Sequence, residues 1–286
     1  MSNYSNLDRF YFSSDTFSLI NKYTGSTFII KYGGSAMKDK SVQLNVIQDI
    51  SLLYLLGIRI VLVHGGGYLI NNWLSKLNIE PKFNQGLRVT DAQTMEVVEM
   101  VLSGNINKQI VSLFNQNNIA AVGLSGKDAN LITAFPLFSD SNNFTGKVDS
   151  INNKILCTLL DNQFCPVVGS VATDSAGQTY NINADTLASS IAVSMKADKL
   201  ILITDTPGLL YNVHDKSTLI KELNLNKINH LKSNGIITDG MIPKIDCCVD
   251  ALINDVPQVH IIDGRVRYSL LYEILTYSRI GSMLVA

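Results

Sequence analysis

The stretch IIKYGGSAM, residues 29 to 37, ends a run of apolar residues in a lysine and then places two glycines before a turn. Glycines let the backbone approach an anion closely, and a helix that starts after them adds a positive dipole. Lys31 and the amides of Gly33, Gly34 and Ser35 could therefore bind a phosphate group. An exposed lysine beside a tight turn explains the same residues equally well, so the interpretation needs support from the rest of the chain.

Outward from this stretch, short apolar segments alternate with segments of helical periodicity. The apolar segments predict buried strands at 27–31, 58–64, 119–125, 166–171, 199–205 and 258–263. Helical patterns follow Gly67 and cover 40–57, roughly 91–116, 183–196 and 241–253. Strands that are apolar throughout and alternate with helices predict an α/β fold, with a mainly parallel sheet covered on both faces. Residues 131–150, rich in Asn, Ser and Asp, predict an irregular hairpin.

The composition argues against several classes of protein. The chain has 286 residues, of which 46% are hydrophobic and 16% charged, and its net charge is −1. Because there is no basic run and no apolar run of membrane-spanning length, neither nucleic acid nor a membrane is an expected partner. The four cysteines lack the paired short spacing of a zinc site, so no protein-bound metal is predicted: Cys157, Cys165, Cys247 and Cys248.

Ligands of parallel sheets bind at the carboxyl ends of the strands, and further strand ends in this chain are unusual. The segment VHGGG (63–67) ends a strand in Gly65, Gly66 and Gly67. An anion held by main-chain amides would account for three consecutive glycines, since a turn alone needs fewer. Arg88 precedes a helix and could clamp a carboxylate, although for a lone arginine an ordinary surface salt bridge is the favoured interpretation.

Three later motifs combine polar side chains with a turn. In NINAD (181–185), Asn181 and Asn183 alternate with an apolar residue before Asp185, and helix capping is the alternative explanation. A later strand ends in a turn that could receive a base or a ribose and contains Thr204, Asp205 and Gly208. Lys244 follows a Gly-Met turn. Each motif is weak by itself.

Taken in order, these motifs resemble those of the amino acid kinase family, and within it the branch that phosphorylates N-acetyl-L-glutamate. The resemblance begins near residue 13 and covers almost all of the chain. It implies a three-layer αβα sandwich around a mainly parallel sheet. It also implies an N-terminal extension over 1–26 and a kinase domain over 27–286, with a lobe for the acceptor (about 27–180) and a lobe for ATP (about 181–286).

The resemblance further implies roles for individual residues. Lys31 and Lys244 would stabilise the transferring phosphoryl group, and Asp185 would hold both lysines. The acceptor would contact Gly65, Gly66, Gly67, Arg88, Asn181 and Asn183. ATP, carrying most of the Mg²⁺ coordination itself, would contact Gly33, Gly34, Ser35, Thr204, Asp205 and Gly208. The implied nucleophile is a γ-carboxylate with a pKa of about 4.3, which is ionised at neutral pH and needs no general base. His64 is therefore interpreted as structural.

The C-terminal segment 259–285 resembles that of members inhibited by arginine, which carry an extra N-terminal helix and form hexamers as trimers of dimers. Residues 13–23 are the expected counterpart of that helix. Arginine would lie near Glu273 and Gly281, with Tyr268 where the pattern has histidine and Ser282 where it has threonine. Photosynthetic members of this group also bind the PII signalling protein.

Two alternatives stay open. The chain could be another amino acid kinase, such as a glutamate 5-kinase or an aspartokinase, or a non-catalytic arginine sensor of the same fold. Retention of Lys31, Asp185 and Lys244 argues against a sensor. The N-terminus lacks the features of a signal or transit peptide. An Asn- and Ile-rich composition suggests an AT-rich genome, so the expected compartment is the plastid stroma for a plastid-encoded protein, or otherwise the bacterial cytoplasm.

Overall fold

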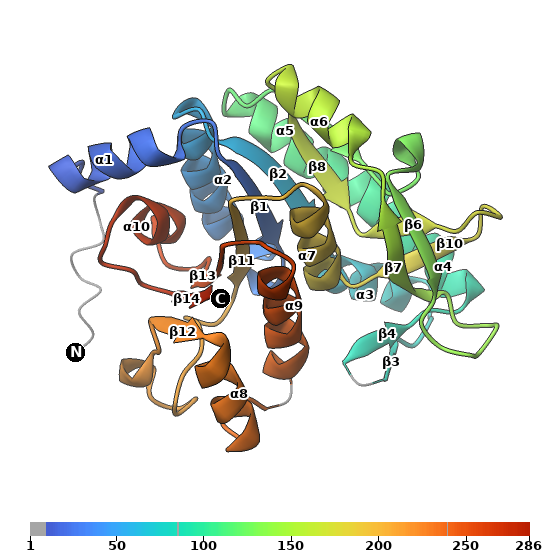
Figure 1. The fold of residues 1–286 in the computed structure, drawn as a ribbon. Coiled ribbons are helices and arrows are strands. Elements are labelled where there is room, and N and C mark those ends of the chain that lie inside the picture. Colours follow the sequence, from blue (N-terminus) through green and yellow to red (C-terminus); the bar gives the residue numbers. More distant parts are fainter. Residues whose placement is uncertain (1–9, 85, 239) are drawn as a thin grey trace.

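A central sheet organises the molecule (Figure 1). The computed structural model describes residues 10–84, 86–238 and 240–286, except for the side chain of Ser35. The sheet has eight strands in the order β12-β14-β13-β11-β1-β2-β8-β5. Neighbouring strands pair in parallel except β13 and β14, so the prediction of a mainly parallel sheet is confirmed. The strands are β1 (Thr27–Tyr32), β2 (Arg59–His64), β5 (Ala121–Leu124), β8 (Cys165–Gly169), β11 (Lys199–Thr204), β12 (Glu222–Asn224), β13 (Gln258–Asp263) and β14 (Ser282–Val285).

Helices cover both faces of this sheet. One face packs against α2 (Lys40–Leu55), α3 (Gly67–Lys76), α4 (Ala92–Glu99), α5 (Asn107–Gln116) and α10 (Ser269–Leu275). The other packs against α6 (Lys154–Asp161), α7 (Ala184–Ser194), α8 (Leu225–Ser233) and α9 (Met241–Ile253). Because side chains alternate along a strand, Ile30 and Leu62 belong to the first hydrophobic layer, and Ile29 and Val61 to the second. The expected three-layer αβα sandwich is confirmed.

The predicted helices correspond closely to the observed ones. The helix α1 (Ser14–Tyr23) matches the prediction over 13–23 and starts with a capping box formed by Ser13 and Thr16. It packs against α10 at the end of the molecule opposite the small barrel described below (Figure 1). The helix predicted over 91–116 has Asp91 as its N-cap, but it contains an unpredicted π-helical stretch, η3 (Met100–Ile106), between α4 and α5.

Two smaller β-structures lie beyond the main sheet. The hairpin predicted over 131–150 consists of β6 (Ile132–Pro136) and β7 (Thr145–Ile151). With β9 (Val171–Thr173) and β10 (Thr179–Ile182) these strands form a small closed barrel. The strand predicted over 166–171 therefore divides between the main sheet and this barrel. A separate ribbon pairs β3 (Lys82–Asn84) with β4 (Leu87–Val89).

The remaining described helices are single turns: η2 (Gly34–Met37), η4 (Asp128–Asn130) and η5 (Lys216–Thr218). Within the described ranges, no helix is both long and apolar enough to cross a membrane. All four cysteines are free thiols, and burial raises the pKa of Cys165 and Cys248. The predicted division into lobes near residue 180 stays a prediction.

Candidate active site

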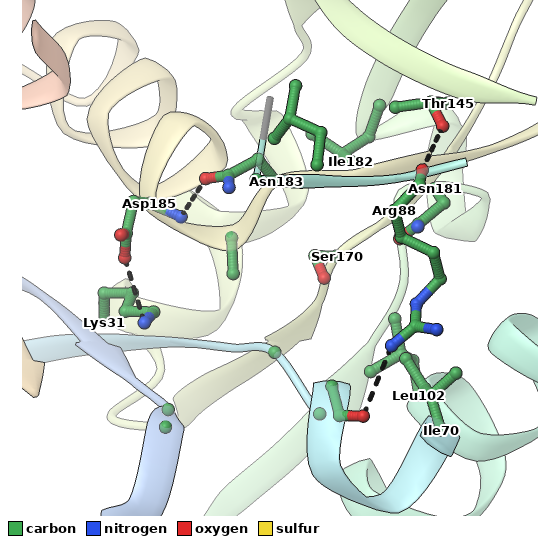
Figure 2. A pocket seen from close by; sticks show the side chains of 18 of the residues that line it. Lys31, Ile70, Arg88, Leu102, Thr145, Ser170, Asn181, Ile182, Asn183 and Asp185 are labelled. Atoms are coloured by element: carbon green, nitrogen blue, oxygen red, sulfur yellow. Dashed lines mark hydrogen bonds and ion pairs between the residues drawn. The ribbon is translucent and has the colours of Figure 1, made fainter. Parts of the chain in front are cut away.

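A cavity of about 310 Å³ lies where β1, β2 and β8 end, between the sheet and the small barrel. Polar and glycine residues from segments far apart in the sequence line it. Figure 2 shows Lys31 and Asp185 on one side, Arg88 on the other and Ser170 between them. The lining includes every acceptor-side residue that the sequence predicts, namely Gly65, Gly66, Gly67, Arg88, Asn181 and Asn183.

Asp185 joins two lysines from different elements. Lys31 Nζ on β1 lies 2.9 Å from Asp185 Oδ1, and Lys244 Nζ on α9 lies 2.7 Å from Oδ2. Lys31 and Asp185 form an ion pair without hydrogen-bond geometry, since Asp185 Oδ1 receives no hydrogen bond from the described residues. Burial by itself raises the pKa of Asp185, but the two ammonium groups outweigh it and hold that pKa well below its usual range. The same pairing raises the pKa of Lys244 against the effect of burial. Asp185 and Lys244 are therefore both charged at neutral pH.

The glycines after β1 leave room for the Lys31 side chain. A Cβ atom on Gly33 would lie 2.7 Å from Lys31 Nζ, closer than the two atoms can approach. Gly34 has φ +69°, a conformation that favours glycine. Gly33 and Gly34 line the cavity beside the lysine, so cation and backbone face the same space. The side chain of Ser35 lies outside the described part of the structure.

The second glycine loop connects β2 to α3. Gly66 is the N-cap of α3, and a Cβ atom there would lie 2.1 Å from Ile106 Cδ1. Glycine is therefore required by close packing against η3. The first amides of a helix have no intrahelical acceptor, so the start of α3 offers N–H donors to an anion in the cavity.

Arg88, at the centre of β4, is 8% exposed and burial lowers its pKa. Its Nη2 donates hydrogen bonds to Asn71 Oδ1 at 2.5 Å and to the Gly67 carbonyl at 3.4 Å. The guanidinium carbon lies 4.9 Å from the centre of the Phe83 ring. Nη1 is buried and has no hydrogen-bond partner among the described residues. Since an unpaired buried donor is costly, this nitrogen is available for an anionic ligand.

The two asparagines of the NINAD motif have different partners. Asn183 caps α7, because its Oδ1 accepts hydrogen bonds from the amides of Asp185 and Thr186. The capping alternative is thus confirmed for Asn183, although it also lines the cavity. Asn181 Nδ2 donates to Thr90 Oγ1 at 3.0 Å.

Sequence analysis missed two hydroxyl residues of the cavity, Thr145 and Ser170. Thr145 Oγ1 donates to the Arg88 carbonyl at 2.5 Å and so links the small barrel to β4. Ser170 lies between β8 and β9. Neither residue follows a glycine turn or belongs to a recognisable motif, and only the fold brings them to the site.

A second cavity of about 280 Å³ lies beyond the end of β11. It is lined by the predicted nucleotide residues Asp205 and Gly208, whereas Thr204 ends β11 and donates to Asp205 Oδ1 at 3.3 Å. The sequence analysis did not predict several residues of its wall: Val213, Lys216, Ile236, Met241 and Arg265. Met241 begins α9, whose next turn carries Lys244, so this helix connects the second cavity to the first.

The predicted arginine residues lie away from both cavities. Glu273 Oε1 lies 2.8 Å from His260 Nδ1, and Oε2 accepts hydrogen bonds from the amides of Ile280 and Gly281 at 3.1 and 2.9 Å. Glu273 and Gly281 are therefore in direct contact. Tyr268 is the left-handed N-cap of α10, the helix that carries Glu273.

Comparisons with known proteins place the chain among kinases. The sequence model of the amino acid kinase family matches residues 26–263. Acetylglutamate kinase of Gracilaria tenuistipitata var. liui is 52% identical over 282 residues, which cover 98% of this chain and 99% of that protein. Acetylglutamate kinase of Nostoc punctiforme is 52% identical over 272 residues, covering 95% and 91% of the two chains.

Solved structures share the fold at lower identity. N-acetylglutamate synthase from Neisseria gonorrhoeae, complexed with coenzyme A and N-acetyl-glutamate, superposes with a TM-score of 0.84 at 24% identity. The match covers 95% of this chain and only 62% of that one. Giardia carbamate kinase has a TM-score of 0.67 at 16% identity, with 91% and 99% covered. These likenesses support the αβα sandwich and carry no conclusion about the substrate.

Proposed function

This chain belongs to the amino acid kinase family, and we propose that it is an acetylglutamate kinase. It transfers the γ-phosphoryl group of ATP to the γ-carboxylate of N-acetyl-L-glutamate and forms N-acetyl-L-glutamyl 5-phosphate, a step of arginine biosynthesis. Relatives that share half of its residues over nearly its whole length support the substrate. The observation that carries the proposal is the pair of lysines held by Asp185 between two cavities.

The chemistry asks the protein to bring two anions together. The acceptor carboxylate and the nucleotide phosphates repel each other, and charge on the transferred group must be neutralised as it moves. Lys31 and Lys244 supply that positive charge from opposite sides of Asp185. Because Asp185 is held ionised by both lysines, it orients them and does not act as a base.

The acceptor has a second anionic end, its α-carboxylate. Arg88 lies across the cavity from Lys31 and Asp185 (Figure 2), and its Nη1 has no hydrogen-bond partner among the described residues. Arg88 therefore holds the α-carboxylate, while the amides of Gly66 and Gly67 face the γ-carboxylate that reacts. Binding at both ends fixes the direction of attack, which is the larger part of catalysis in phosphoryl transfer.

ATP occupies the second cavity, with its phosphates directed past Gly33 and Gly34 toward Lys31. The bare glycine backbone and the two ammonium groups fit a triphosphate. Mg²⁺ arrives with the nucleotide and neutralises phosphate charge when bound. In this proposal the phosphates would supply most of the ligands of the metal.

The test is formation of acyl phosphate, trapped as the hydroxamate, with ATP and N-acetylglutamate, glutamate or aspartate in parallel. Turnover of N-acetylglutamate alone is expected. If glutamate or aspartate were turned over instead, the assignment of the phosphate site would stand, but the assignment of N-acetylglutamate as the acceptor would be wrong. Without any turnover, calorimetric titration of an ATP analogue and of arginine distinguishes an inactive kinase from a sensor, because a sensor binds arginine only.

Arginine inhibition is a second part of the proposal. It is supported by α1 and by the contact of Glu273 with Gly281, which juxtaposes the two residues expected near the inhibitor. An arginine guanidinium would replace the Ile280 and Gly281 amides on the Glu273 carboxylate. Turnover measured against arginine concentration tests this, and Glu273→Gln is expected to weaken inhibition. Unchanged inhibition in that variant would place the inhibitor elsewhere.

Assembly and location complete the proposal. The protein forms a hexamer as a trimer of dimers, binds PII, and functions in a plastid or in a bacterial cytoplasm. Relatives from Gracilaria, Porphyra and Nostoc are consistent with both locations. Light scattering coupled to gel filtration tests the hexamer, and a PII pull-down with purified proteins tests the partner.

A further inference from the structure

A buried polar network lies directly beneath the second glycine loop, and the reaction described above does not use it. His64, the last residue of β2, is 0% exposed, and Asn107, the first residue of α5, is 1% exposed. Asn107 Nδ2 lies 3.1 Å from His64 Nε2, 2.8 Å from the Val167 carbonyl and 3.3 Å from the Leu124 carbonyl. Burying two polar side chains in an apolar layer is costly unless they are hydrogen-bonded, and these contacts supply the hydrogen bonds.

The network determines which ring nitrogen of His64 carries the proton. Two carbonyl oxygens accept from Asn107 Nδ2, and Lys108 Nζ donates to Oδ1 at 3.2 Å, so the nitrogen of the amide, which is a donor only, is the atom that faces His64 Nε2. Nε2 of His64 must then accept a hydrogen bond. Burial lowers the pKa of His64 to about 4, so the ring is neutral and its single proton is on Nδ1.

That proton has one acceptor, the carbonyl of Gly65, at 3.2 Å from Nδ1. In a trans peptide the C=O and the next N–H point in opposite directions. A Gly65 carbonyl turned toward the buried imidazole therefore turns the Gly66 N–H away from it, toward the cavity that Gly65, Gly66 and Gly67 line. The direction of one substrate-facing amide is linked to the tautomer of a histidine below it.

The π-helical stretch brings Asn107 to this position. η3 ends at Ile106, immediately before Asn107, and its side chains pack directly on the glycine loop, since a Cβ atom on Gly66 would lie 2.1 Å from Ile106 Cδ1 and 2.9 Å from Leu102 Cδ2. A Cβ atom on Gly123 would lie 1.9 Å from Asn107 Oδ1, so β5 also leaves space for this side chain. π-Helical turns inside α-helices are rare and occur mostly at functional sites.

We propose that Asn107 is a positioning residue of the acceptor site: it keeps His64 in the Nδ1–H tautomer, which holds the Gly65 carbonyl and aims the Gly66 amide at the reacting carboxylate. The inference rests on the proposed function for the identity of that carboxylate. It does not depend on that function for the tautomer, which is a property of the free protein.

The first experiment reads the tautomer in the unmodified chain. Nitrogen NMR of protein labelled in its histidine rings distinguishes protonated from unprotonated ring nitrogens, and His64→Asn assigns the His64 signals among the four histidines. The proton is expected on Nδ1 across the range from pH 6 to 8, which lies above the pKa of about 4. A proton on Nε2 would overturn the inference, whatever the substrate is.

The second experiment measures kinetics of Asn107→Leu against the matched variant Asn105→Leu. Asn105 lies in η3 and accepts a hydrogen bond from Gln109 without touching the loop. Asn107→Leu is expected to raise the KM for the acceptor by about tenfold, the effect of one hydrogen bond to a charged group, while the KM for ATP stays constant. Asn105→Leu should leave both values unchanged. An equal loss in the two variants, or an unchanged acceptor KM in Asn107→Leu, would contradict the proposed role.

A conservative pair separates positioning from general support of the fold. In His64→Asn the amide nitrogen takes the place of Nδ1 and can still donate to the Gly65 carbonyl, whereas His64→Leu cannot. His64→Asn is expected to retain an acceptor KM within about threefold of the unmodified value, and His64→Leu to raise it by about tenfold. If both variants unfold at the same denaturant concentration yet show the same KM, the inference fails. Should the unmodified chain phosphorylate a different acid, the proposed function fails and the same comparisons are made with that acid.

Discussion

Two clusters in this molecule contain similar groups and have opposite relations to solvent. At the open cluster, Lys31 and Asp185 line a cavity and Lys244 pairs with Asp185. The side chains of Lys31, Asp185 and Lys244 are 11%, 16% and 13% exposed. At the closed cluster, Lys199, His260 and Glu273 lie inside the fold, and the last two side chains are 1% and 0% exposed. The charged groups of the open cluster lie beside a space that a ligand can enter. In the closed cluster, the Glu273 carboxylate contacts backbone amides and a histidine ring nitrogen of the protein itself.

The difference shows that charge by itself does not identify a site. In the closed cluster, burial and nearby cations lower the pKa of Lys199 to about 7, and burial lowers that of His260 despite its hydrogen bond to Glu273. Burial thereby reduces the positive charge on Lys199 and His260 inside the fold. In the open cluster the reverse holds, because Asp185 keeps Lys244 protonated against burial. A cluster that holds its cations charged despite burial is the better candidate for anion chemistry.

The substitution with the largest expected effect removes a lysine from the open cluster. Lys244→Ala should lower kcat about 100- to 1,000-fold, because it removes roughly 2.7–4 kcal/mol of charge stabilisation from the transition state. Lys232→Ala is the control, since Lys232 forms only an exposed pair with Asp246. Steady-state kinetics at saturating ATP and acceptor measure both. Full activity of Lys244→Ala would remove this lysine from the mechanism.

The next prediction concerns a substitution that removes the carboxylate of the closed cluster. Glu273→Ala should lower the free energy of unfolding by about 3 kcal/mol, because it leaves two amides and His260 without their buried acceptor. Glu222→Ala removes the same side chain from an exposed pair with Arg279 and should cost less than about 1 kcal/mol. Urea denaturation compares the two variants. Equal losses of unfolding free energy in the two variants would mean that burial does not determine how much these carboxylates contribute to stability.

A third variant tests the far side of the first cavity. Arg88→Ala should raise the KM for the acceptor about tenfold or more and leave the KM for ATP unchanged, because Arg88 lies with the acceptor residues and away from the second cavity. Initial rates at varied acceptor concentration measure this. A rise in the KM for ATP alone would reverse the assignment of the two cavities.

The smallest predicted effect concerns pH and the helix that carries Glu273. Burial raises the pKa of Asp49 to about 8, although its carboxyl accepts hydrogen bonds from the Leu270 and Leu271 amides at the start of α10 and lies near Arg267. A raised folded-state pKa adds stability at low pH that is lost as pH rises through 8. Between pH 7 and 9, ionisation of Asp49 should lower the free energy of unfolding by about 1.4 kcal/mol.

Asp49→Asn keeps an acceptor for the α10 amides and removes the titration. Its free energy of unfolding should fall less between pH 7 and 9 than that of the unmodified chain. Lys199, with its lowered pKa, contributes in the opposite direction but equally in both proteins. Parallel pH profiles for the two proteins would contradict the raised pKa of Asp49.

Local signals in the sequence were enough to predict most of the framework. Uniformly apolar runs identified strands such as β11 and β13, and Asp91 identified the start of α4. The glycine loops and charged residues at strand ends drew attention to the cavity wall that the fold assembles. In each case the residues of a short segment were sufficient to predict the structure of that segment.

Other features could not be predicted because their causes are distant in the sequence. Thr145 reaches the cavity through a barrel whose strands come from two separate segments, the pair β6–β7 and the pair β9–β10. The side chains of η3 pack against Gly66 in the second glycine loop, and Asn107, directly after η3, occupies space that Gly123 leaves in β5. The enclosure of Glu273 depends on the Ile280 and Gly281 amides folding back onto it.

The position of α9 has a consequence for how this protein can change over evolutionary time. Met241 borders the second cavity and Lys244 reaches Asp185, and three residues of helix separate them by only about 4.5 Å along the axis. A rigid turn of helix cannot shift one residue without the other. Mutations that reshape the proposed nucleotide wall by moving this helix would therefore also displace Lys244, the proposed phosphoryl-binding lysine. Under the proposed function, nucleotide preference and phosphoryl transfer would be inherited together, whereas the proposed acceptor wall, built from β4 and the small barrel, would be free to diversify.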